Sequence, residues 1–268
     1  MVKKKRRRIK NKKLIFKRPI FWIIVLFLII IFLLLYLFLF FSKIQVNSVI
    51  AGGNYSVLSE DIENIAWNNI NKKIITLGNW NLVSKSIFLA GSEIIVKNIL
   101  NKFPQIESAK VSKEFPQTIV LQIKERVPFA AFCQTDDKKC FYIDENGIIF
   151  EVLEQIPKDT SIIRQLREDQ EVFAGEKVVE KNIMDIINNV KRSLKDNFQI
   201  DVKEAIISNP SRLNIETSEN WQIYLNTDLE SDLQIVKMNL LLRDEIPASG
   251  RKGLQYIDLR FKDRAYYK

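Results

Sequence analysis

The hydrophobic pattern begins with one continuous apolar run, residues 20–41, which holds 22 residues and no charged side chain. At a rise of about 1.5 Å per residue, such a helix is roughly 33 Å long, enough for a hydrocarbon core of about 30 Å. A cleavable signal peptide has a shorter apolar region, about 7–15 residues, that ends in small residues. This run ends at Phe41 and is followed by Ser42 and Lys43, not by a series of small residues. We therefore predict an uncleaved transmembrane helix over residues 20–41.

After this run, apolar positions follow the periods of short strands and helices, which predicts a compact α+β module. Ser59, followed by Glu60 and Asp61, marks a helix start because a capping side chain and early acids complement the helix dipole. Pro104 ends a second helix. The expected elements are a strand at 44–49, a helix from 59 to about 70, a loop with apolar patches at 71–91, a helix at 92–102, and strands at about 109–113 and 119–123.

Residues 128–268 follow mostly strand periods, interrupted by two helices. The expected elements are two strands around a turn at 144–147, a helix at about 179–194, strands near 202–207, 213–216 and 221–225, a helix near 229–242, and a last strand, 255–260, continuing through 261–267. We predict an α+β protein with a single N-terminal transmembrane helix, a β-α-α-β-β module and a mostly antiparallel β domain with two helices. The predicted boundaries are 1–19, 20–41, 43–127 and 128–268.

Positive charge is concentrated ahead of the apolar run, where residues 1–18 contain eleven Lys or Arg and no acid. Such segments stay on the cytoplasmic side, so we expect residues 43–268 to lie outside the cytoplasm. We expect the tail to bind anionic lipid headgroups. The net charge is +9, so the rest of the chain has 30 basic against 32 acidic side chains. This balance argues against a nucleic-acid-binding surface.

The composition excludes several kinds of catalytic and metal site. The chain contains no histidine, which rules out a Ser-His-Asp triad and any histidine base or metal ligand. Its two cysteines, Cys133 and Cys140, are too few for a four-ligand zinc site. They flank a polar run, and two alternatives stay open for them: a disulfide that closes a hairpin, or two unpaired thiols on neighbouring strands. We expect no metal and no cofactor.

Two pairs of neighbouring charged residues invite a catalytic interpretation. Asp144 and Glu145 resemble the paired carboxylates of acid–base catalysis, but in the sequence Asp-Glu-Asn-Gly we expect Asp144 to order a turn by accepting backbone N–H groups. Glu125 and Arg126 follow a predicted strand, where we expect a local ion pair or a lock between subdomains. We predict no catalytic residue.

Five short motifs, each present once, follow one another along most of the chain. Residues 100–111 read L-N-K-F-P-Q-I-E-S-A-K-V, and K-E-F-P-Q-T and E-R-V-P-F-A follow at 113–118 and 125–130. A D-x-x-G turn lies within Y-I-D-E-N-G-I-I-F at 142–150, and Y-I-D-L-R-F occupies 256–261. With the basic tail and single anchor, these motifs resemble the FtsQ/DivIB family of bacterial cell-division proteins, whose first module is an FtsQ-type POTRA domain. The 71–91 connection and the cysteine pair depart from the family pattern.

This resemblance implies a non-enzymatic scaffold of the divisome, anchored by one helix in the cytoplasmic membrane of a bacterium and located at the division septum. The implied partners are FtsB/DivIC-type and FtsL-type subunits and components of the septal synthase. In the family, the strand after Y-x-D-L-R binds a small membrane subunit by β-strand addition. Carried over to this sequence, the partner-binding strand is Phe261, Lys262, Asp263, Arg264, Ala265, Tyr266 and Tyr267.

Alternatives to each of these interpretations remain open at this point. The final strand is structural in the simpler reading, with its charged side chains solvated. A POTRA-type chaperone or transport module is a second class, although such proteins usually carry repeated POTRA units or a β-barrel, and neither pattern is found. A membrane-anchored cell-wall enzyme is a third class, and it would rely on acidic residues because histidine is absent.

Overall fold

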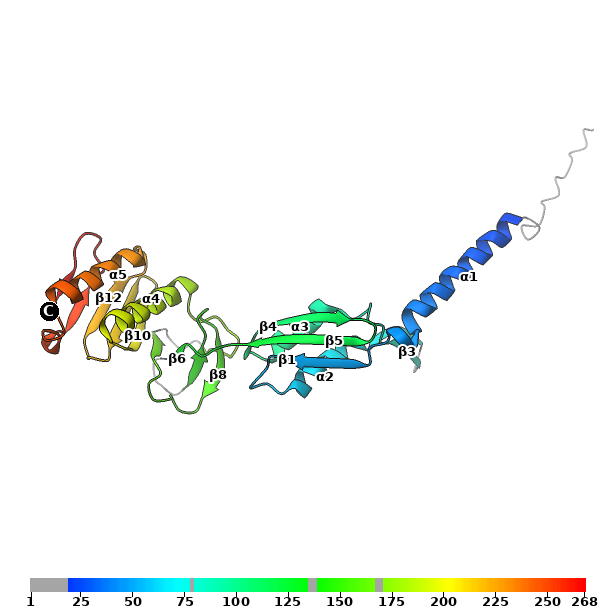
Figure 1. The fold of residues 1–268 in the computed structure, drawn as a ribbon, viewed down its shortest axis with the longest axis horizontal. Coiled ribbons are helices and arrows are strands. Elements are labelled where there is room, and N and C mark those ends of the chain that lie inside the picture. The colour runs from blue at the N-terminus through cyan, green and yellow to red at the C-terminus, as the bar shows by residue number, and fades with distance from the viewer. Residues whose placement is uncertain (1–18, 78–79, 135–138, 167–170) are drawn as a thin grey trace, which may run out of the picture. The chain divides into compact units, whose positions relative to one another are not determined.

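The computed structural model describes residues 19–77, 80–134, 139–166 and 171–268, which form two compact units (Figure 1). Of the described residues, the first unit holds 19–52, 59–95 and 110–122, and the second holds 53–58, 96–109 and 123–268. The basic tail predicted at 1–19 lies outside the described residues, apart from Pro19. The observed architecture is α+β, as the sequence predicts.

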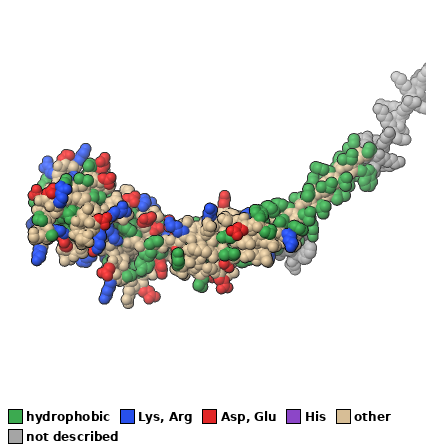
Figure 2. All heavy atoms as spheres, in the orientation of Figure 1, with side chains coloured by type: hydrophobic (Ala, Val, Ile, Leu, Met, Phe, Trp, Pro, Cys, Tyr) green, Lys and Arg blue, Asp and Glu red, His purple; other side chains and the backbone are tan. Residues whose placement is uncertain are grey.

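The first element is α1, Pro19–Phe40, a helix of 22 residues that contains no charged side chain. None of its residues is buried, and it is the one described helix that is long and apolar enough to cross a membrane. Figure 2 shows apolar side chains along its visible face. A free helix of this composition is stable only where its side chains meet hydrocarbon rather than water. The single apolar helix therefore fits a transmembrane segment.

A three-stranded sheet with two helices follows α1. Its strand order is β1-β5-β4, and β1 runs parallel to β5 in the register Ser48↔Thr118 to Gly52↔Gln122. Helix α2 buries Ile62, Ala66 and Ile70, which recur at helical spacing. The elements are β1 Ser48–Gly52, α2 Ser59–Ile70, β2 Lys72–Leu77, β3 Trp80–Ser84, α3 Ser92–Lys102, β4 Ile106–Glu114 and β5 Thr118–Glu125. The β-α-α-β-β order predicted from the sequence is present.

The loop predicted for residues 71–91 is wrong in part, because it contains an antiparallel hairpin. Strands β2 and β3 pair from Lys72↔Ser84 to Leu77↔Trp80, with a register shift between Lys73 and Ile75. The shift interrupts the alternation of apolar and polar positions on which a strand prediction depends. The sequence of this segment therefore lacks the regular alternation that predicts a strand.

The second unit contains a nine-stranded mixed sheet with the order β14-β13-β12-β11-β10-β9-β6-β7-β8. The pairings β6–β9, β9–β10 and β12–β13 are parallel, and the other pairings of this sheet are antiparallel. Its elements are β6 Ala130–Cys133, β7 Cys140–Ile143, β8 Ile149–Leu153, β9 Ile162–Gln165, α4 Lys181–Phe198, β10 Val202–Asn209, β11 Arg212–Thr217, β12 Gln222–Asn226, α5 Ser231–Leu240, β13 Tyr256–Asp258 and β14 Tyr266–Tyr267.

The core of the second unit lies between this sheet and its helices. Helices α4 and α5 contact each other, and α4 contacts β10 (Figure 1). The helix predicted at about 179–194 is present as α4, and its apolar stripe of Ile183, Ile186, Ile187, Val190 and Leu194 is buried. Trp221 is fully buried in the same core. The helix itself begins and ends later than predicted, and α5 continues into a π-helical turn, Leu241–Glu245.

The last strand differs from its prediction. Strand β13 ends at Asp258, and the chain turns and returns as β14, antiparallel to β13 in the register Ile257↔Tyr267 and Asp258↔Tyr266. Only Tyr266 and Tyr267 of the predicted strand 261–267 are in a strand. The turn is fixed by Asp258, whose carboxylate accepts hydrogen bonds from the backbone N–H and the guanidinium of Arg260. An Asp side chain that bonds its own backbone two residues on favours a turn over an extended strand.

Candidate functional site

The C-terminal strand β14 lies at the end of the strand order of the nine-stranded sheet. On one side it is paired with β13: Gln255 N and Tyr256 N donate to Lys268 O at 2.5 and 3.3 Å, and Lys268 N donates to Tyr256 O at 3.2 Å. In an antiparallel pair, consecutive residues alternate in the side toward which their N–H and C=O groups point. The backbone groups of Tyr267 therefore face away from β13, and no described strand pairs with β14 there.

The opposite edge of the sheet, at β8, is covered where that strand begins. Ile149 N donates to Glu176 O at 3.0 Å, Gly175 N donates to Ile149 O at 2.6 Å, and Val178 N donates to Gly147 O at 2.9 Å. A covered edge does not present its backbone groups to another chain. The two edges therefore differ at these positions: Ile149 of β8 is bonded to residues 175 and 176, whereas Tyr267 of β14 has open backbone groups next to exposed aromatic side chains.

Residues 261–265, between β13 and β14, form an ordered turn rather than a strand. The Lys237 ammonium donates to Phe261 O at 2.7 Å and to Lys262 O at 2.9 Å, which ties the turn to α5. The rings of Phe261 and Tyr266 meet edge to face with centroids 5.3 Å apart, and both side chains are nearly half exposed. The predicted site residues are thus brought together at one end of the sheet, but as a turn plus a short strand.

The Asp258–Arg260 pair at the start of this turn is strongly held. The Arg260 guanidinium donates to both carboxylate oxygens, at 2.8 and 2.5 Å. Burial opposes ionisation of Asp258, but the hydrogen bonds from Arg260 outweigh burial, so the pKa of this carboxyl lies below its usual value. The hydrogen bond to Asp258 likewise raises the pKa of Arg260. Both groups stay charged, which keeps the turn closed.

Helix α5, which lies within the helix predicted near 229–242, carries an exposed apolar stripe. Leu233, Val236 and Leu240 recur at helical spacing, and they are 52%, 51% and 44% exposed. Lys237 of the same helix holds the turn at Phe261, so the stripe belongs to the helix that contacts the candidate site. An amphipathic helix normally turns its apolar stripe inward, so this exposed stripe departs from the usual arrangement. Exposed side chains in such a row are typical of a protein–protein contact.

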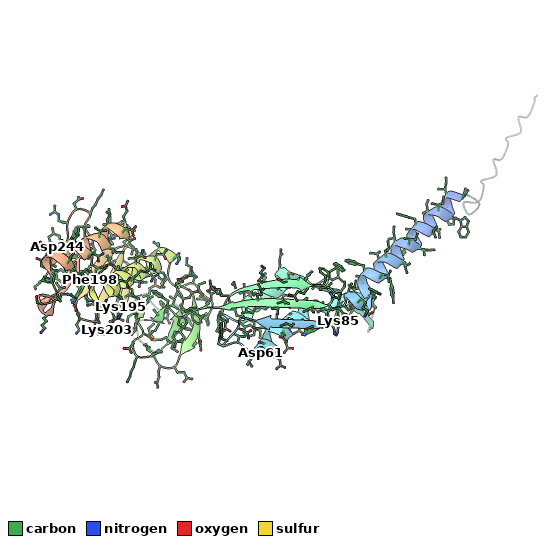
Figure 3. The ribbon with its side chains drawn as sticks, in the orientation of Figure 1. Asp61, Lys85, Lys195, Phe198, Lys203 and Asp244 are labelled. Carbon is green, nitrogen blue, oxygen red and sulfur yellow. A yellow bond between two sulfur atoms is a disulfide. The ribbon has the colours of Figure 1, made fainter. Side chains whose placement is uncertain are left out.

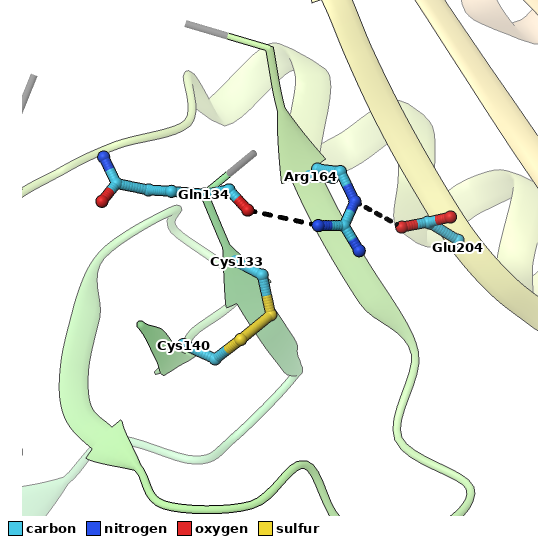
Figure 4. Close-up of a disulfide and its surroundings, with 5 residues drawn as sticks. All are labelled: Cys133, Gln134, Cys140, Arg164 and Glu204. Carbon is cyan, nitrogen blue, oxygen red and sulfur yellow. Dashed lines mark hydrogen bonds and ion pairs between the residues drawn. A yellow bond between two sulfur atoms is a disulfide. The ribbon is translucent and has the colours of Figure 1, made fainter. Parts of the chain in front are cut away.

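Cys133 and Cys140 are joined by a disulfide (Figure 4). They lie directly opposite each other on β6 and β7, and both are buried. Next to them, Arg164 of β9 donates to Glu204 of β10 at 2.8 Å and to Gln134 O at 3.2 Å (Figure 4). Buried, bonded sulfurs offer no reactive thiol, and this cluster joins neighbouring strands of the sheet.

Glu125 and Arg126 do not form an ion pair with each other. The Glu125 carboxylate accepts hydrogen bonds from the backbone N–H groups of Tyr55, Ser56 and Val57, at 2.8–3.1 Å. Burial opposes ionisation of Glu125, but these bonds and one from the Ser56 hydroxyl lower its pKa. Arg126 has a different set of partners: its Nε donates to Pro104 O at 3.0 Å, and its Nη1 donates to Asp144 in the turn between β7 and β8.

Asp144, in that turn, orders the backbone as predicted. Its Oδ1 accepts N–H bonds from Asn146 and Ile148, both at 2.9 Å. Its Oδ2 lies 2.5 Å from Arg126 Nη1, and its side chain is 4% exposed. A carboxylate with its lone pairs occupied in this way is not free for acid–base chemistry. In the described part of the chain, no group of three or more Asp, Glu, Cys or His side chains is arranged to hold a metal ion.

The fold and this site define a class of protein with one apolar anchor helix, a POTRA module and a mixed-sheet domain that ends in an open edge. Family models match both parts: the FtsQ/DivIB C-terminal domain matches residues 131–260, and the FtsQ-type POTRA domain matches residues 70–126. The chain belongs to the FtsQ/DivIB family of cell-division proteins.

Individual relatives carry the same family name. The cell division protein DivIB of Clostridium tetani is 30% identical over 177 residues, which are 62% of this chain and 63% of that protein. The cell division protein DivIB of Clostridium botulinum strain Loch Maree is 29% identical over 239 residues, which are 84% of this chain and 86% of that protein. The first alignment thus spans slightly less than two thirds of its relative, and the second spans most of it.

Proposed function

We propose that this chain is a non-enzymatic scaffold of the divisome that recruits or stabilises other membrane-anchored division subunits. The open edge at β14 carries the proposal, because unpaired backbone groups at the end of a sheet accept a strand from a partner. The proposed partner strand pairs with the outward N–H and C=O of Tyr267, and an apolar segment of the same partner covers Leu233, Val236 and Leu240 on α5. The partners proposed are subunits of the FtsB/DivIC and FtsL types and components of the septal synthase.

The proposed topology follows from charge. Residues 1–18 stay in the cytoplasm and bind anionic headgroups, residues 20–41 span the membrane of a bacterium at the division septum, and the POTRA module (43–127) and the β domain (128–268) lie outside. Co-anchoring in one membrane raises the effective concentration of each partner, so contacts that are weak in solution are sufficient.

The test compares two substitutions at one position. Tyr267→Pro removes the outward N–H but leaves the two hydrogen bonds between Tyr256 and Lys268 in place, whereas Tyr267→Val removes the same aromatic ring and keeps the N–H. Each variant, and a truncation that lacks 261–268, is fused at its N-terminus to a fluorescent protein and imaged in dividing native cells. Co-purification with the proposed partners is measured in parallel.

We expect the full chain and Tyr267→Val to form a band at midcell and to retain partners, and Tyr267→Pro and the truncation to lose partners. A midcell band that survives in Tyr267→Pro with full partner recovery would refute strand addition at this edge. Uniform membrane fluorescence from a functional full-length fusion would refute the division role itself. Binding of generic extended peptides would favour the chaperone class, and a turnover lost in Asp144→Asn with the fold intact would favour an enzyme.

A further inference from the structure

The end of α1 is held by polar side chains from the last residue of β3 and from the segment that follows it. Ser84 Oγ donates to Leu39 O at 2.5 Å, and Ser86 Oγ donates to Phe38 O at 3.0 Å. The last carbonyl groups of a helix have no partner within the helix, so they need such donors when water is excluded. Both serine residues are at most 1% exposed. Their burial is accounted for by these bonds to the helix end.

Backbone hydrogen bonds join the same segment to the residues just after α1. Val46 N donates to Lys85 O at 2.9 Å, and Ile87 N donates to Ile44 O at 3.0 Å. Lys85, labelled in Figure 3, lies beside the end of the helix. From the turn between β4 and β5, the Gln117 amide donates to Ser42 O at 2.9 Å. The helix end, the segment 84–89 and the β4–β5 turn are thus connected directly.

Three aromatic side chains continue from the helix onto these two segments. The rings of Phe38 and Phe88 are stacked, with centroids 4.9 Å apart and planes 19° apart, and the ring of Phe115 lies 5.4 Å from that of Phe88. They remain 42%, 45% and 60% exposed, and Phe41, three residues after Phe38, is 47% exposed. Figure 2 shows apolar side chains continuing from α1 onto the adjoining end of the module. A row of exposed aromatic rings is unfavourable in water.

We propose that Phe88 and Phe115, together with Phe38 and Phe41, form a membrane-contacting cluster that lies in the headgroup region of the leaflet from which α1 emerges. The occupant of this surface is the lipid bilayer, because the cluster is continuous with the helix: Phe38 belongs to the last turn of α1 and stacks on Phe88. Aromatic side chains are favoured at that depth, where their rings meet both acyl chains and headgroups.

Charged residues around the cluster fix its depth. Lys43 follows Phe41 by two residues and is exposed, where an ammonium group meets lipid phosphates. Glu114, the exposed neighbour of Phe115, is costly to place in hydrocarbon, so the cluster stays at the headgroup level rather than deeper. The cluster therefore gives the POTRA module a second attachment to the membrane besides the helix. This inference does not depend on the proposed docking edge.

The test places the photoreactive residue p-benzoylphenylalanine at one position at a time in the full chain, reconstituted in vesicles of phosphatidylethanolamine and phosphatidylglycerol. The positions are 88 and 115 in the cluster, 38 as the positive control in the helix, and 173 as the negative control. Phe173 is 54% exposed and belongs to the second unit, so it matches the cluster in side chain and exposure. Lipid adducts are identified by mass spectrometry after irradiation.

We expect lipid adducts at 38, 88 and 115 and none at 173. Adducts at 38 alone would overturn the inference while leaving the helix in the membrane, and equal adducts at 88 and 173 would overturn it as unspecific contact. A second measurement uses a nitroxide on Phe115→Cys, with the native cysteines kept in their disulfide. The ratio of relaxation by molecular oxygen to relaxation by a water-soluble nickel chelate should be higher for this label than for one on Phe173→Cys, and equal ratios at the two positions would also overturn the inference.

Discussion

Replacing Arg126 by methionine should destabilise the turn between β7 and β8 by about 3 kcal/mol. Arg126 Nη1 lies 2.5 Å from Asp144 Oδ2, and the two side chains are 13% and 4% exposed. Removing one partner of a buried ion pair costs about 3–5 kcal/mol, since the remaining charge is left without compensation. The lower end applies here because Asp144 Oδ1 keeps its bonds from Asn146 N and Ile148 N. Methionine retains most of the apolar stem of arginine.

Hydrogen exchange of the full chain, resolved by mass spectrometry, measures this effect at the amides of Asn146 and Ile148. Because about 1.4 kcal/mol corresponds to a factor of ten, exchange of these amides through opening of the turn should accelerate roughly 150-fold. Arg243→Met is the matched control: Arg243 pairs with Asp244, labelled in Figure 3, but both side chains are more than half exposed. A surface pair of this kind contributes little, so exchange should not change measurably.

A double-mutant cycle separates the ion pair from the other hydrogen bond that Arg126→Met removes, which runs from Arg126 Nε to Pro104 O at 3.0 Å. Asp144→Asn keeps an oxygen for the two amide donors and removes the charge, so the pair Arg126→Met and Asp144→Asn should show a coupling energy of about 2 kcal/mol. A coupling near zero, or equal effects of Arg126→Met and Arg243→Met on exchange, would refute the reasoning. The turn would then be held by its backbone bonds alone.

Three further predictions concern stability. Hydrogen bonds lower the pKa of Glu125 in the folded protein. Its contribution to the free energy of unfolding is therefore complete above about pH 4.3, the pKa in unfolded chains, and is lost as pH falls through the lower folded pKa. In Glu125→Gln, the free energy of unfolding measured in urea should depend less on pH across that acidic range. Gly147→Ala should lower the free energy of thermal unfolding by about 1 kcal/mol or more, because Gly147 has a φ of +81° and a Cβ there would collide with Val179 O. Reducing Cys133–Cys140, which closes a loop with a sequence separation of 7, should cost about 2–3 kcal/mol in urea unfolding.

The elements that the sequence predicts correctly are those in which one strong pattern decides the outcome. The uncharged run of α1 has no stable position outside hydrocarbon, and the α4 stripe has one apolar face that must be buried. The turn at Asp144 is also decided locally. The side chain that accepts the backbone N–H groups and the glycine that turns the backbone lie within four residues of each other. Local chemistry is sufficient in each case.

The elements missed depend on distant partners. Strand β9, Ile162–Gln165, has four residues and is stabilised by parallel pairing with β6 and β10 on either side. Hairpin β2–β3 contains a register shift that removes the alternation. The ion pair of Arg126 and the hydrogen bonds of Glu125 join segments 18 and up to 70 residues apart. Contacts of this kind leave no periodic signal in the chain.

The fold of the C-terminal residues restricts how the proposed docking edge can work. The predicted seven-residue strand would offer a long ladder, whereas β14 has two residues, and Tyr267 alone presents an outward N–H and C=O.

Two hydrogen bonds contribute about 1–3 kcal/mol in net terms. Covering Leu233, Val236 and Leu240, each about half exposed, adds roughly 1 kcal/mol apiece. The sum falls short of the roughly 8 kcal/mol that a micromolar complex requires in solution. Under the proposed function, confinement of both proteins to one membrane must supply the rest, so a soluble fragment of a partner should bind far more weakly than the membrane-anchored subunit.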